Sequence, residues 1–346
     1  MAAPKTFPIL FIASSRIGDA VLASGLVKRL HDEIPNARFT VVAGPLSAPL
    51  FADVPNLSQV VVMEKGKGGG HWFKLWTQVR GRNWGLIVDR RGSGVSRFLR
   101  AKRRAIHRSL PGEPVHKVVE AARLLKMQDD PPGPFLFTSP ETEARADALL
   151  AEGSGPILAL APAANWVGKT WPAERFALMA VQLMQKGQPF EKGRVLILGG
   201  PDDRRNAEPL RRSLPRDRWV DLTGKVDLLT AYACLKRARL FVGNDSGLMH
   251  LAAAAGAPTL GLFGPSDERL YGPWGEYTRV SRGPRGFGQI KAKDPDLNQP
   301  VCHMLDLKVE TVLDDARALY EASQPLFGPV RRPRAKKAAA VEAPEG

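Results

Sequence analysis

The chain has 346 residues, 44% of them hydrophobic and 25% charged, with a formal net charge of +15 at pH 7. This length favours two domains, and no apolar stretch approaches the roughly 20 residues that a bilayer requires, which excludes a membrane-spanning protein. The first predicted strand begins at Phe7, which leaves no room for a signal peptide, and two cysteines give no disulfide framework. We therefore expect a cytoplasmic protein.

Apolar, β-branched runs alternate with helical patterns along the first half of the chain. This alternation predicts parallel strands covered by helices. A basic, glycine-rich segment at 66–70 predicts a loop, and 19–34 predicts one helix with Val21, Leu22 and Leu30 on a shared face. The predicted strands cover residues 7–13, 38–43, 59–63 and 86–89.

Breaks at 129–134 and 152–156 place a domain boundary near residue 150, after which the alternation restarts. We therefore predict an α/β fold of two Rossmann-like, doubly wound domains, 1–150 and 151–325, followed by a basic tail at 326–346 without regular structure. The strands predicted in the second domain are 157–160, 194–198, 219–222, 240–242 and 259–263, and the helices are 173–186, 204–213, 228–237 and 247–255.

Two such domains in tandem predict a nucleotide site in the cleft beyond the carboxyl ends of their strands. The first strand is followed by Ser-Ser-Arg-Ile-Gly-Asp at 14–19, which is not the Gly-x-Gly-x-x-Gly turn of a dinucleotide fold. The chain contains no Gly-x-x-x-x-Gly-Lys-Ser/Thr loop, and no acidic residue closes the second strand. These features disfavour NAD enzymes and P-loop enzymes.

The sharpest local signal is the segment 242–252, where a strand ends and a helix of small residues begins at Ser246. The free N–H groups of Ser246, Gly247 and Leu248 and the helix dipole would form a diphosphate cradle. Ordinary capping by Asp245 or Ser246 is the alternative, but it does not explain the glycines or His250 one turn inside the helix.

Lys169 lies in the loop that follows the first strand of the second domain, at the end of the strand where ligands bind. Its ammonium group is a compact cation able to reach a phosphate. Taken alone, a lysine in a loop is more often an ordinary surface residue.

Four segments, 15–19, 168–172, 244–250 and 261–266, together resemble the heptosyltransferases of glycosyltransferase family 9, which build the inner core of lipopolysaccharide. The resemblance implies a GT-B fold and an inverting transfer, without metal or cofactor, from an ADP-heptose-like donor. It implies that Asp19 is the general base and that Lys169 binds the donor phosphates. The donor-binding residues that it implies are Gly18, Asp202, Asp245, Ser246, Gly247, Leu248 and His250.

The chemistry of such a transfer agrees with these residues. The enzyme must stabilise the departing negative charge, which suits Lys169 and the helix at Ser246, and must remove a proton from the acceptor hydroxyl, which suits Asp19. Without the resemblance, Asp19 would be interpreted as a first-turn acid that stabilises its helix. The Asp-Pro-Asp sequence at 294–296 has the letters of a metal-binding pair, but its polar context indicates a solvated loop.

Most of the excess charge lies between Lys65 and Lys126, where sixteen lysines and arginines face three acids. This stretch is either a solvated basic face or a surface for nucleic acid or phosphorylated lipid. No nucleic-acid-binding motif is visible, and the resemblance places the acceptor on the N-terminal domain. We therefore predict that this stretch binds an anionic lipid A–Kdo type acceptor and the inner-membrane surface through Arg100, Lys102, Arg103 and Arg104.

The prediction for the whole protein is thus a monomeric glycosyltransferase, cytoplasmic and peripherally associated with the inner membrane, with no nucleic-acid partner. Three alternatives stay open. They are another GT-B transferase with a different sugar or a protein acceptor, a nucleotide-sugar epimerase, and a basic nucleic-acid-binding protein.

Overall fold

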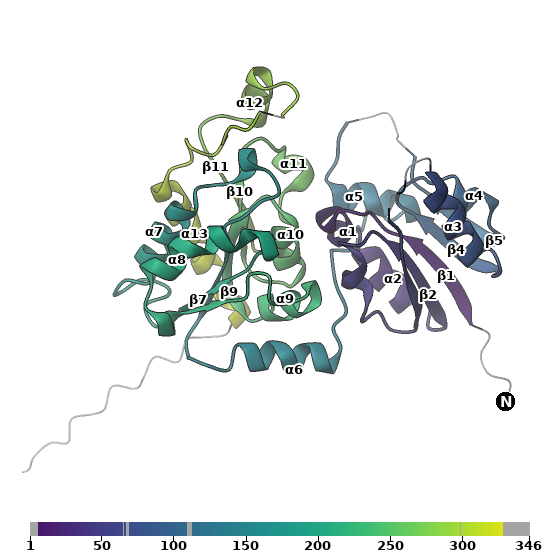
Figure 1. The fold of residues 1–346 in the computed structure, drawn as a ribbon, viewed down its shortest axis with the longest axis horizontal. Helices are drawn as coiled ribbons and strands as arrows, with labels where there is room; N and C mark the ends of the chain where they lie inside the picture. The colour runs from purple at the N-terminus through teal and green to yellow at the C-terminus, as the bar shows by residue number, and fades with distance from the viewer. Residues whose placement is uncertain (1–5, 65, 67–68, 109–112, 298, 328–346) are drawn as a thin grey trace, which may run out of the picture.

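The computed structural model describes residues 6–327 except 65, 67–68, 109–112 and 298. Two lobes lie side by side, each built on a parallel sheet with helices on its faces (Figure 1). Residues 328–346 of the predicted basic tail lie outside the described residues. Among the helices described, none is long and apolar enough to cross a membrane.

The N-terminal sheet has five parallel strands in the order β3-β2-β1-β4-β5. The central strand β1 is almost wholly apolar, with residues 9–12 fully buried, because helices cover both faces of the sheet. The strands are β1 (Phe7–Ile12), β2 (Ala37–Ala43), β3 (Leu57–Val62), β4 (Trp84–Asp89) and β5 (Ala101–Ile106). The helices of this lobe are α1 (Ile17–Leu22), α2 (Gly25–Glu33), α3 (Gly70–Val79), α4 (Val95–Phe98) and α5 (Lys117–Ala122), with the short 3₁₀ helices η1 (Ala48–Phe51) and η3 (Arg123–Leu125).

The single helix predicted at 19–34 is wrong, because the structure breaks it into α1 and α2 at Ser24. The Ser24 hydroxyl donates to the Val21 carbonyl (2.7 Å) and accepts from the N–H of Phe135 (3.0 Å). A Cβ at Gly25 would lie 2.2 Å from the Gly133 carbonyl oxygen, so only glycine admits this close approach. The segment 126–139, which joins η3 to α6 and is called the linker below, therefore packs on the break between α1 and α2. The spacing of apolar residues in the sequence does not reveal this contact.

The C-terminal sheet has six parallel strands in the order β11-β10-β9-β6-β7-β8. They are β6 (Ile157–Ala161), β7 (Arg194–Ile197), β8 (Trp219–Asp221), β9 (Ala238–Asn244), β10 (Thr259–Phe263) and β11 (Thr278–Arg282). The helices are α7 (Ala173–Leu183), α8 (Arg204–Ser213), α9 (Leu228–Leu235), α10 (Gly247–Ala254), α11 (Glu268–Tyr271), α12 (Phe287–Lys293) and α13 (Val309–Ala322), with the 3₁₀ helices η4 (Val167–Lys169), η5 (Pro201–Asp203), η6 (Arg216–Arg218) and η7 (Gln324–Phe327).

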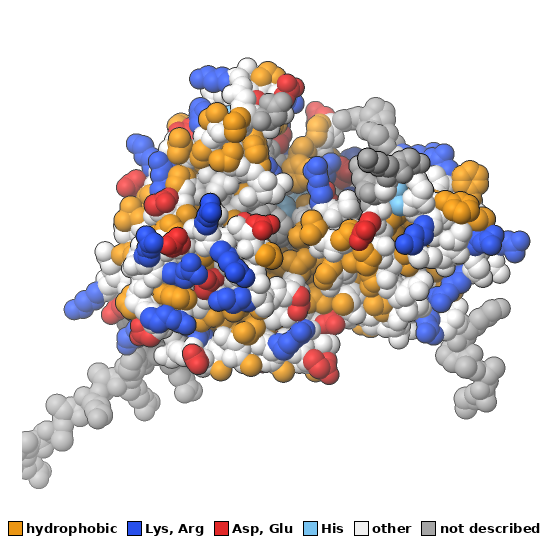
Figure 2. Space-filling model, viewed as in Figure 1, with side chains coloured by type: hydrophobic (Ala, Val, Ile, Leu, Met, Phe, Trp, Pro, Cys, Tyr) orange, Lys and Arg blue, Asp and Glu red, His pale blue; other side chains and the backbone are white. Residues whose placement is uncertain are grey.

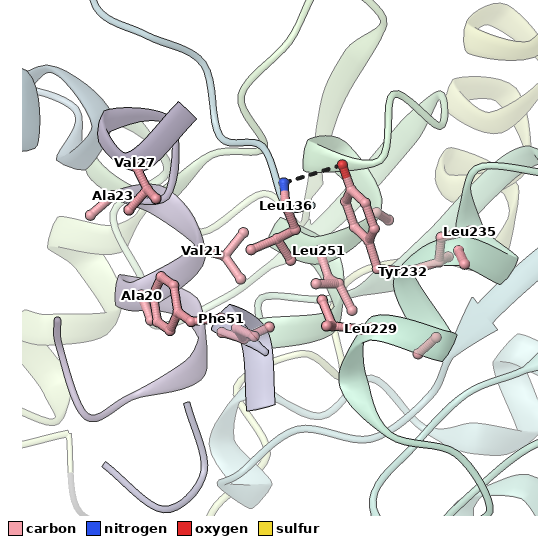
Figure 3. Close-up of a cluster of buried hydrophobic side chains, with 14 of the residues drawn as sticks. Ala20, Val21, Ala23, Val27, Phe51, Leu136, Leu229, Tyr232, Leu235 and Leu251 are labelled. Carbon is pink, nitrogen blue, oxygen red and sulfur yellow. Dashed lines mark hydrogen bonds between the residues drawn. The ribbon is translucent and has the colours of Figure 1, made fainter. Parts of the chain in front are cut away.

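The two lobes share one apolar core where they meet (Figure 3). Val21 of α1 and Phe51 of η1 belong to the same buried cluster as Leu229 of α9 and Leu251 of α10. Leu136, from the linker, adds to this cluster, and its N–H donates to the Tyr232 hydroxyl (3.3 Å). Because burial of apolar surface stabilises the contact, this cluster fixes α1 against α10.

The helix α6 (Pro140–Leu149) follows the linker and contacts both lobes. Glu143 forms ion pairs with Lys236 (2.7 Å) and Arg237 (2.6 Å) beside α9. Burial raises the pKa of Glu143, but hydrogen bonds from Lys236, Thr138 and Arg237 outweigh it and lower the pKa to about 2. At the N-cap of the same helix, Asp53 of the N-terminal lobe accepts from the Ser139 N–H (2.7 Å). The boundary at residue 150 stays a prediction, because α6 bridges the two lobes.

Candidate active site between the two lobes

The helices α1 and α10 each follow a central strand of their own sheet, and their first turns touch. A Cβ at Gly18 would lie 3.0 Å from Cδ2 of His250, and a Cβ at Gly247 would lie 2.8 Å from Cγ2 of Ile17. The lack of a side chain at both positions therefore lets the two helix ends meet. As a result, Gly18 in one lobe lies against His250 and Gly247 in the other, and Asp19 is the next residue along α1.

The N-terminus of α10 has no side-chain cap. Ser246 is the N-cap, yet its side chain makes no capping hydrogen bond, and its hydroxyl oxygen is buried without a partner. Asp245 does not cap the helix either, because its carboxylate pairs with Lys169. The N–H groups at Ser246, Gly247 and Leu248 thus stand at a helix end with the positive pole of the dipole. The alternative of ordinary capping is wrong for this helix.

Lys169 lies at the end of η4, and its Nζ contacts Oδ2 of Asp245 at 2.7 Å. The aspartate side chain is 7% exposed and the lysine side chain 27% exposed, so the lysine is the partner that reaches solvent. Asn244 holds the two loops together, because its Oδ1 accepts from the Trp171 N–H and its Nδ2 donates to the Pro162 carbonyl, both at 3.0 Å. The sequence prediction gave Asn244 no role of its own.

His250 lies one turn inside α10, and its Nε2 is 4.0 Å from Oδ1 of Asp245. Burial lowers the pKa of His250 to about 4, against a weaker opposing effect of Asp245, so the imidazole is neutral at pH 7. Around the N-terminus of α10 the described side chains thus include the cation Lys169 and the anion Asp245. An incoming phosphate would find Lys169 as the mobile positive charge and α10 as the fixed one.

The loop that follows β10 lies beside the loop that follows β9, because the two strands are neighbours in the sheet. Arg282, at the end of β11, donates to the carbonyls of Gly264 and Ser266 and pairs with Glu268, each at 2.5 Å. These bonds fix the segment 264–268 beside the site. On the N-terminal lobe, Nε2 of His116 contacts the Gly272 carbonyl at 2.9 Å, so α5 is joined to the loop after α11. The sequence gives no signal for His116.

Asp202 lies in η5, after β7, two strands away from β9. Its side chain is exposed, and it has no described contact with Lys169 or Asp245. The neighbouring Asp203 accepts instead from the Gly200 N–H (2.7 Å). Asp202 therefore lies at the same edge of the sheet as the site, but outside the group that the structure brings together.

The predicted acceptor cluster Arg100, Lys102, Arg103 and Arg104 lies elsewhere. It belongs to β5, the edge strand, and begins at the strand's amino end, where Ala101 pairs with Trp84. Asp19 follows the carboxyl ends of the strands, so the structure does not bring the cluster to it. The Arg104 guanidinium also donates to the backbone carbonyls of Ser96, Leu99 and Ala101, which leaves Arg100, Lys102 and Arg103 as the free cations.

Residues 294–296 correct another prediction. Asp294 is 2% exposed and contacts Nε2 of His303 at 3.2 Å, so the interpretation as a solvated loop is wrong for Asp294. Asp296 is exposed, as predicted. In the described part of the chain no cluster of three or more histidine, cysteine or acidic side chains could hold a metal ion.

Residues 83–300 match the family described as glycosyltransferase family 9 (heptosyltransferase). The chain belongs to this family. It is 28% identical to a lipooligosaccharide heptosyltransferase 2 of Haemophilus influenzae, over 79% of this chain and 88% of that one. It is 24% identical to the lipopolysaccharide heptosyltransferase 2 of Salmonella typhimurium, over 90% of this chain and 98% of the relative. The protein is therefore a glycosyltransferase, as the resemblance implied.

Solved structures agree on the fold. A family 9 glycosyltransferase from Veillonella parvula superposes with a TM-score of 0.75 at 19% identity, covering 93% of this chain and all of that one. The ADP-heptose lipopolysaccharide heptosyltransferase II of Escherichia coli gives 0.71 at 22% identity, over 92% and 99% of the two chains. The predicted GT-B arrangement of two Rossmann-like domains is confirmed.

Proposed function

We propose that this protein transfers a heptose from ADP-heptose to a hydroxyl group in the inner core of lipopolysaccharide, with inversion at the anomeric carbon. One observation carries the proposal: the first turn of α1, with Asp19, lies against the first turn of α10, with Lys169 and Asp245 beside it. The two chemical requirements of the transfer, a base and a cradle for the leaving diphosphate, are thus side by side.

On the donor side, the diphosphate would lie at the N-terminus of α10, where the N–H groups of Ser246, Gly247 and Leu248 donate to its oxygens. Lys169 would exchange its contact with Asp245 for one with the phosphate. Asp202 would lie near the nucleotide ribose. The names of the relatives above support a heptose donor, and a further solved neighbour, an Escherichia coli heptosyltransferase, contains ADP.

On the acceptor side, an acceptor oxygen attacks the anomeric carbon while the bond from that carbon to the diphosphate oxygen breaks. The acceptor's proton passes to Asp19, and ADP leaves with the electron pair. In the described residues no hydrogen bond or ion pair engages the Asp19 carboxylate, so it is free to accept the proton. A carboxylate is a weak base, but proton transfer late in bond formation lets it act.

The N-terminal lobe would dock on the anionic face of the inner membrane. Phe73 on α3 and Phe98 on α4 are 68% and 80% exposed, and Phe73 stacks on Trp76 with the ring centres 5.8 Å apart. In Figure 2 apolar side chains protrude beside lysine and arginine side chains at the outer end of this lobe, over α3 and α4. Exposed aromatic rings among cations are typical of peripheral membrane binding. The proposal takes the protein to act as a monomer.

A donor screen tests the proposed function. The protein is incubated with an anionic lipid A–Kdo acceptor and, in parallel, with ADP-heptose, other ADP-sugars and UDP-sugars, and both the glycolipid product and the released nucleotide are measured. We expect product and ADP only with ADP-heptose or a close analogue. Transfer of another sugar, or no transfer, contradicts the proposal. An epimerised nucleotide sugar formed without acceptor would instead identify an epimerase.

A further inference from the structure

Arg90 lies at the carboxyl edge of the N-terminal sheet, beside the segment that carries Asp19. It directly follows β4, and its own N–H donates to the carbonyl of Ile12, the last residue of β1, at 2.9 Å. Asp19 follows the same strand β1 within a few residues. Arg90 therefore belongs to the edge where a doubly wound sheet places its ligands.

The side chain of Arg90 is half-buried, and two of its three guanidinium nitrogens have no hydrogen-bond partner among the described residues. Its Nε and Nη1 are fully buried and have no hydrogen bond, and within the described residues its guanidinium forms no ion pair. Arg194 and Arg239 also have unpaired buried nitrogens, but each uses its Nη2 in a hydrogen bond. Burying two guanidinium nitrogens without partners is costly to folding, so their presence at a ligand edge requires a reason.

The acids nearby do not satisfy Arg90. Asp89 next to it uses its carboxylate on the N–H groups of Arg91 and Ser93 and on the hydroxyls of Ser93 and Ser96, at 2.6 to 2.9 Å. Glu120 is paired with Lys117. Asp19 acts on Arg90 only through space, with no hydrogen bond between them.

The two acids that act on Arg90 also show where its charge lies. Burial lowers the pKa of Arg90, and the charges of Glu120 on α5 and Asp19 on α1 oppose this effect. These are the helices through which the N-terminal lobe contacts α10 and the loop at Gly272. Arg90 is thus placed in the N-terminal lobe, at the carboxyl edge of the sheet from which α1 leads to the contact with α10.

We propose that Arg90 binds an anionic group of the acceptor, a carboxylate or a phosphate monoester, next to the hydroxyl that Asp19 deprotonates. This inference rests on the proposed function. The planar fork of a guanidinium matches either anion. The donor's phosphates already have α10 and Lys169 in the other lobe, so the anion that reaches Arg90 comes from the acceptor. Arg90 would then select an acceptor by charge and fix its hydroxyl near Asp19.

The test compares Arg90→Gln and Arg90→Lys with the wild type and with the control Arg97→Gln. Arg97 is an exposed cation on the nearby helix α4, so its variant removes the same charge without touching the junction. Three acceptors are used: the intact one, one with its carboxylates esterified and one with its phosphates removed. The measurements are KM for each acceptor, kcat, the Kd for ADP, direct binding of the acceptors by calorimetry, and Tm.

For Arg90→Gln we expect the Kd and KM for the intact acceptor to rise roughly 10- to 100-fold, since a hydrogen bond to a charged group is lost. The Kd for ADP should stay within about twofold, and Arg97→Gln should behave as wild type. Arg90→Lys should recover part of the affinity but not the fork geometry. If the wild type and Arg90→Gln bind the esterified acceptor equally well, the anion at Arg90 is a carboxylate. If they bind the dephosphorylated acceptor equally well, it is a phosphate.

Stability distinguishes binding from a structural role. Because Arg90→Gln removes a half-buried charge with two unpaired buried nitrogens, we expect its Tm to be equal to or above that of the wild type. A lower Tm, an equal loss with all three acceptors, or an unchanged acceptor Kd would overturn the assignment. If the wild type transfers no sugar, the proposed function fails by itself, and acceptor binding by calorimetry still decides on Arg90.

Discussion

Asp19 occupies the first turn of α1 at the meeting point of the two lobes, and its carboxylate is the only group for which we propose proton transfer. Replacing it by asparagine keeps the size and removes the base. We expect turnover of Asp19→Asn to fall roughly 10²- to 10⁴-fold. The Kd for ADP should not change, because the groups proposed to bind ADP lie on α10, η4 and η5.

The control for this variant is Asp32→Asn, which removes the carboxylate that pairs with Lys28 on the surface of α2. It should retain full turnover. The measurement is the steady-state rate of each variant and of the wild type at saturating donor, with the Kd for ADP measured separately. Turnover of Asp19→Asn within a few-fold of the wild type would exclude Asp19 as the base.

His250 links the site to the pH dependence of stability. Its pKa is about 4 in the folded protein and 6.5 in the unfolded chain, so the unfolded chain takes up the proton first as the pH falls. The stability due to the neutral imidazole is fully present above pH 6.5 and is lost as the pH falls to 4. By linkage the loss is about 3 kcal/mol.

This loss is measured by urea unfolding at several pH values between 7 and 4. Carboxylates also titrate in this range, so the quantity to compare is the difference between the wild type and His250→Gln. The variant, which does not take up this proton, should lose less stability over the interval. Parallel curves for the two proteins would show that His250 is not the neutral buried group described above.

At the scale of helices, the contact between α1 and α10 depends on Gly247. A Cβ there would meet Ile17 at 2.8 Å, inside van der Waals contact, so alanine must push α1 away from the cradle. Because small displacements of reacting groups slow the chemical step, we expect kcat of Gly247→Ala to fall roughly 10- to 100-fold. Alanine favours a helix intrinsically, so propensity alone predicts no loss.

Gly288→Ala, in α12, is the matched control, since a Cβ at Gly288 would meet nothing within 4 Å. Its kcat should equal that of the wild type and its Tm should rise or stay unchanged. If Gly247→Ala is as active as Gly288→Ala, the two lobes are not required to meet at this point during turnover.

The same elements show how far the sequence predicts this molecule. Central strands such as β1 and β9 are buried on both faces, so their apolar runs were recognised. The strand β5, with the sequence Ala-Lys-Arg-Arg-Ala-Ile, and the polar strand β11 were missed, because an edge strand need not be apolar. The acceptor-binding role predicted for Arg100, Lys102, Arg103 and Arg104 stays a prediction. The structure places these cations on this edge strand and just before it, whereas Asp19 lies beyond the carboxyl ends of the strands.

At the candidate site the sequence predicted the residues of the two helix N-termini. It did not predict the residues that hold these helix ends and loops in place. The segment 244–250 has a local signal, because Gly247 and a histidine follow a strand directly. Arg90, in contrast, is one of sixteen cations in its stretch of sequence and is distinguished only by its burial. Residues such as Asn244 and His116 act through contacts with distant segments, which no local pattern encodes.

On the scale of the whole molecule, the charge is concentrated on one lobe, and this asymmetry predicts how the protein meets a membrane. Arg100, Lys102 and Arg103 are exposed on the outer strand or just before it, and Phe73 and Phe98 of the same lobe are exposed as well. Each such cation contributes about 1 kcal/mol near an anionic surface. Neutralising all three to glutamine should therefore weaken binding to phosphatidylglycerol vesicles about 100-fold at low salt.

The two kinds of side chain should respond differently to salt. Binding of the wild type should weaken steeply as salt is raised, because screening acts over roughly 8–10 Å at physiological ionic strength. Phe73→Ser with Phe98→Ser should lower affinity at every salt concentration, since burial of the rings in the bilayer is not electrostatic. Arg104 is left unchanged in these variants, because its guanidinium holds three backbone carbonyls and its loss would disturb the edge of the sheet.

A control triple variant removes the exposed cations Lys186, Arg204 and Arg205 from the C-terminal lobe. It changes the net charge by the same amount, so a protein attracted only by its total charge would lose the same affinity in both triple variants. Docking through the outer face of the N-terminal lobe predicts instead that the control still sediments with the vesicles. The N-terminal variant alone should show a raised KM for the lipid-embedded acceptor and an unchanged KM for the same acceptor in detergent.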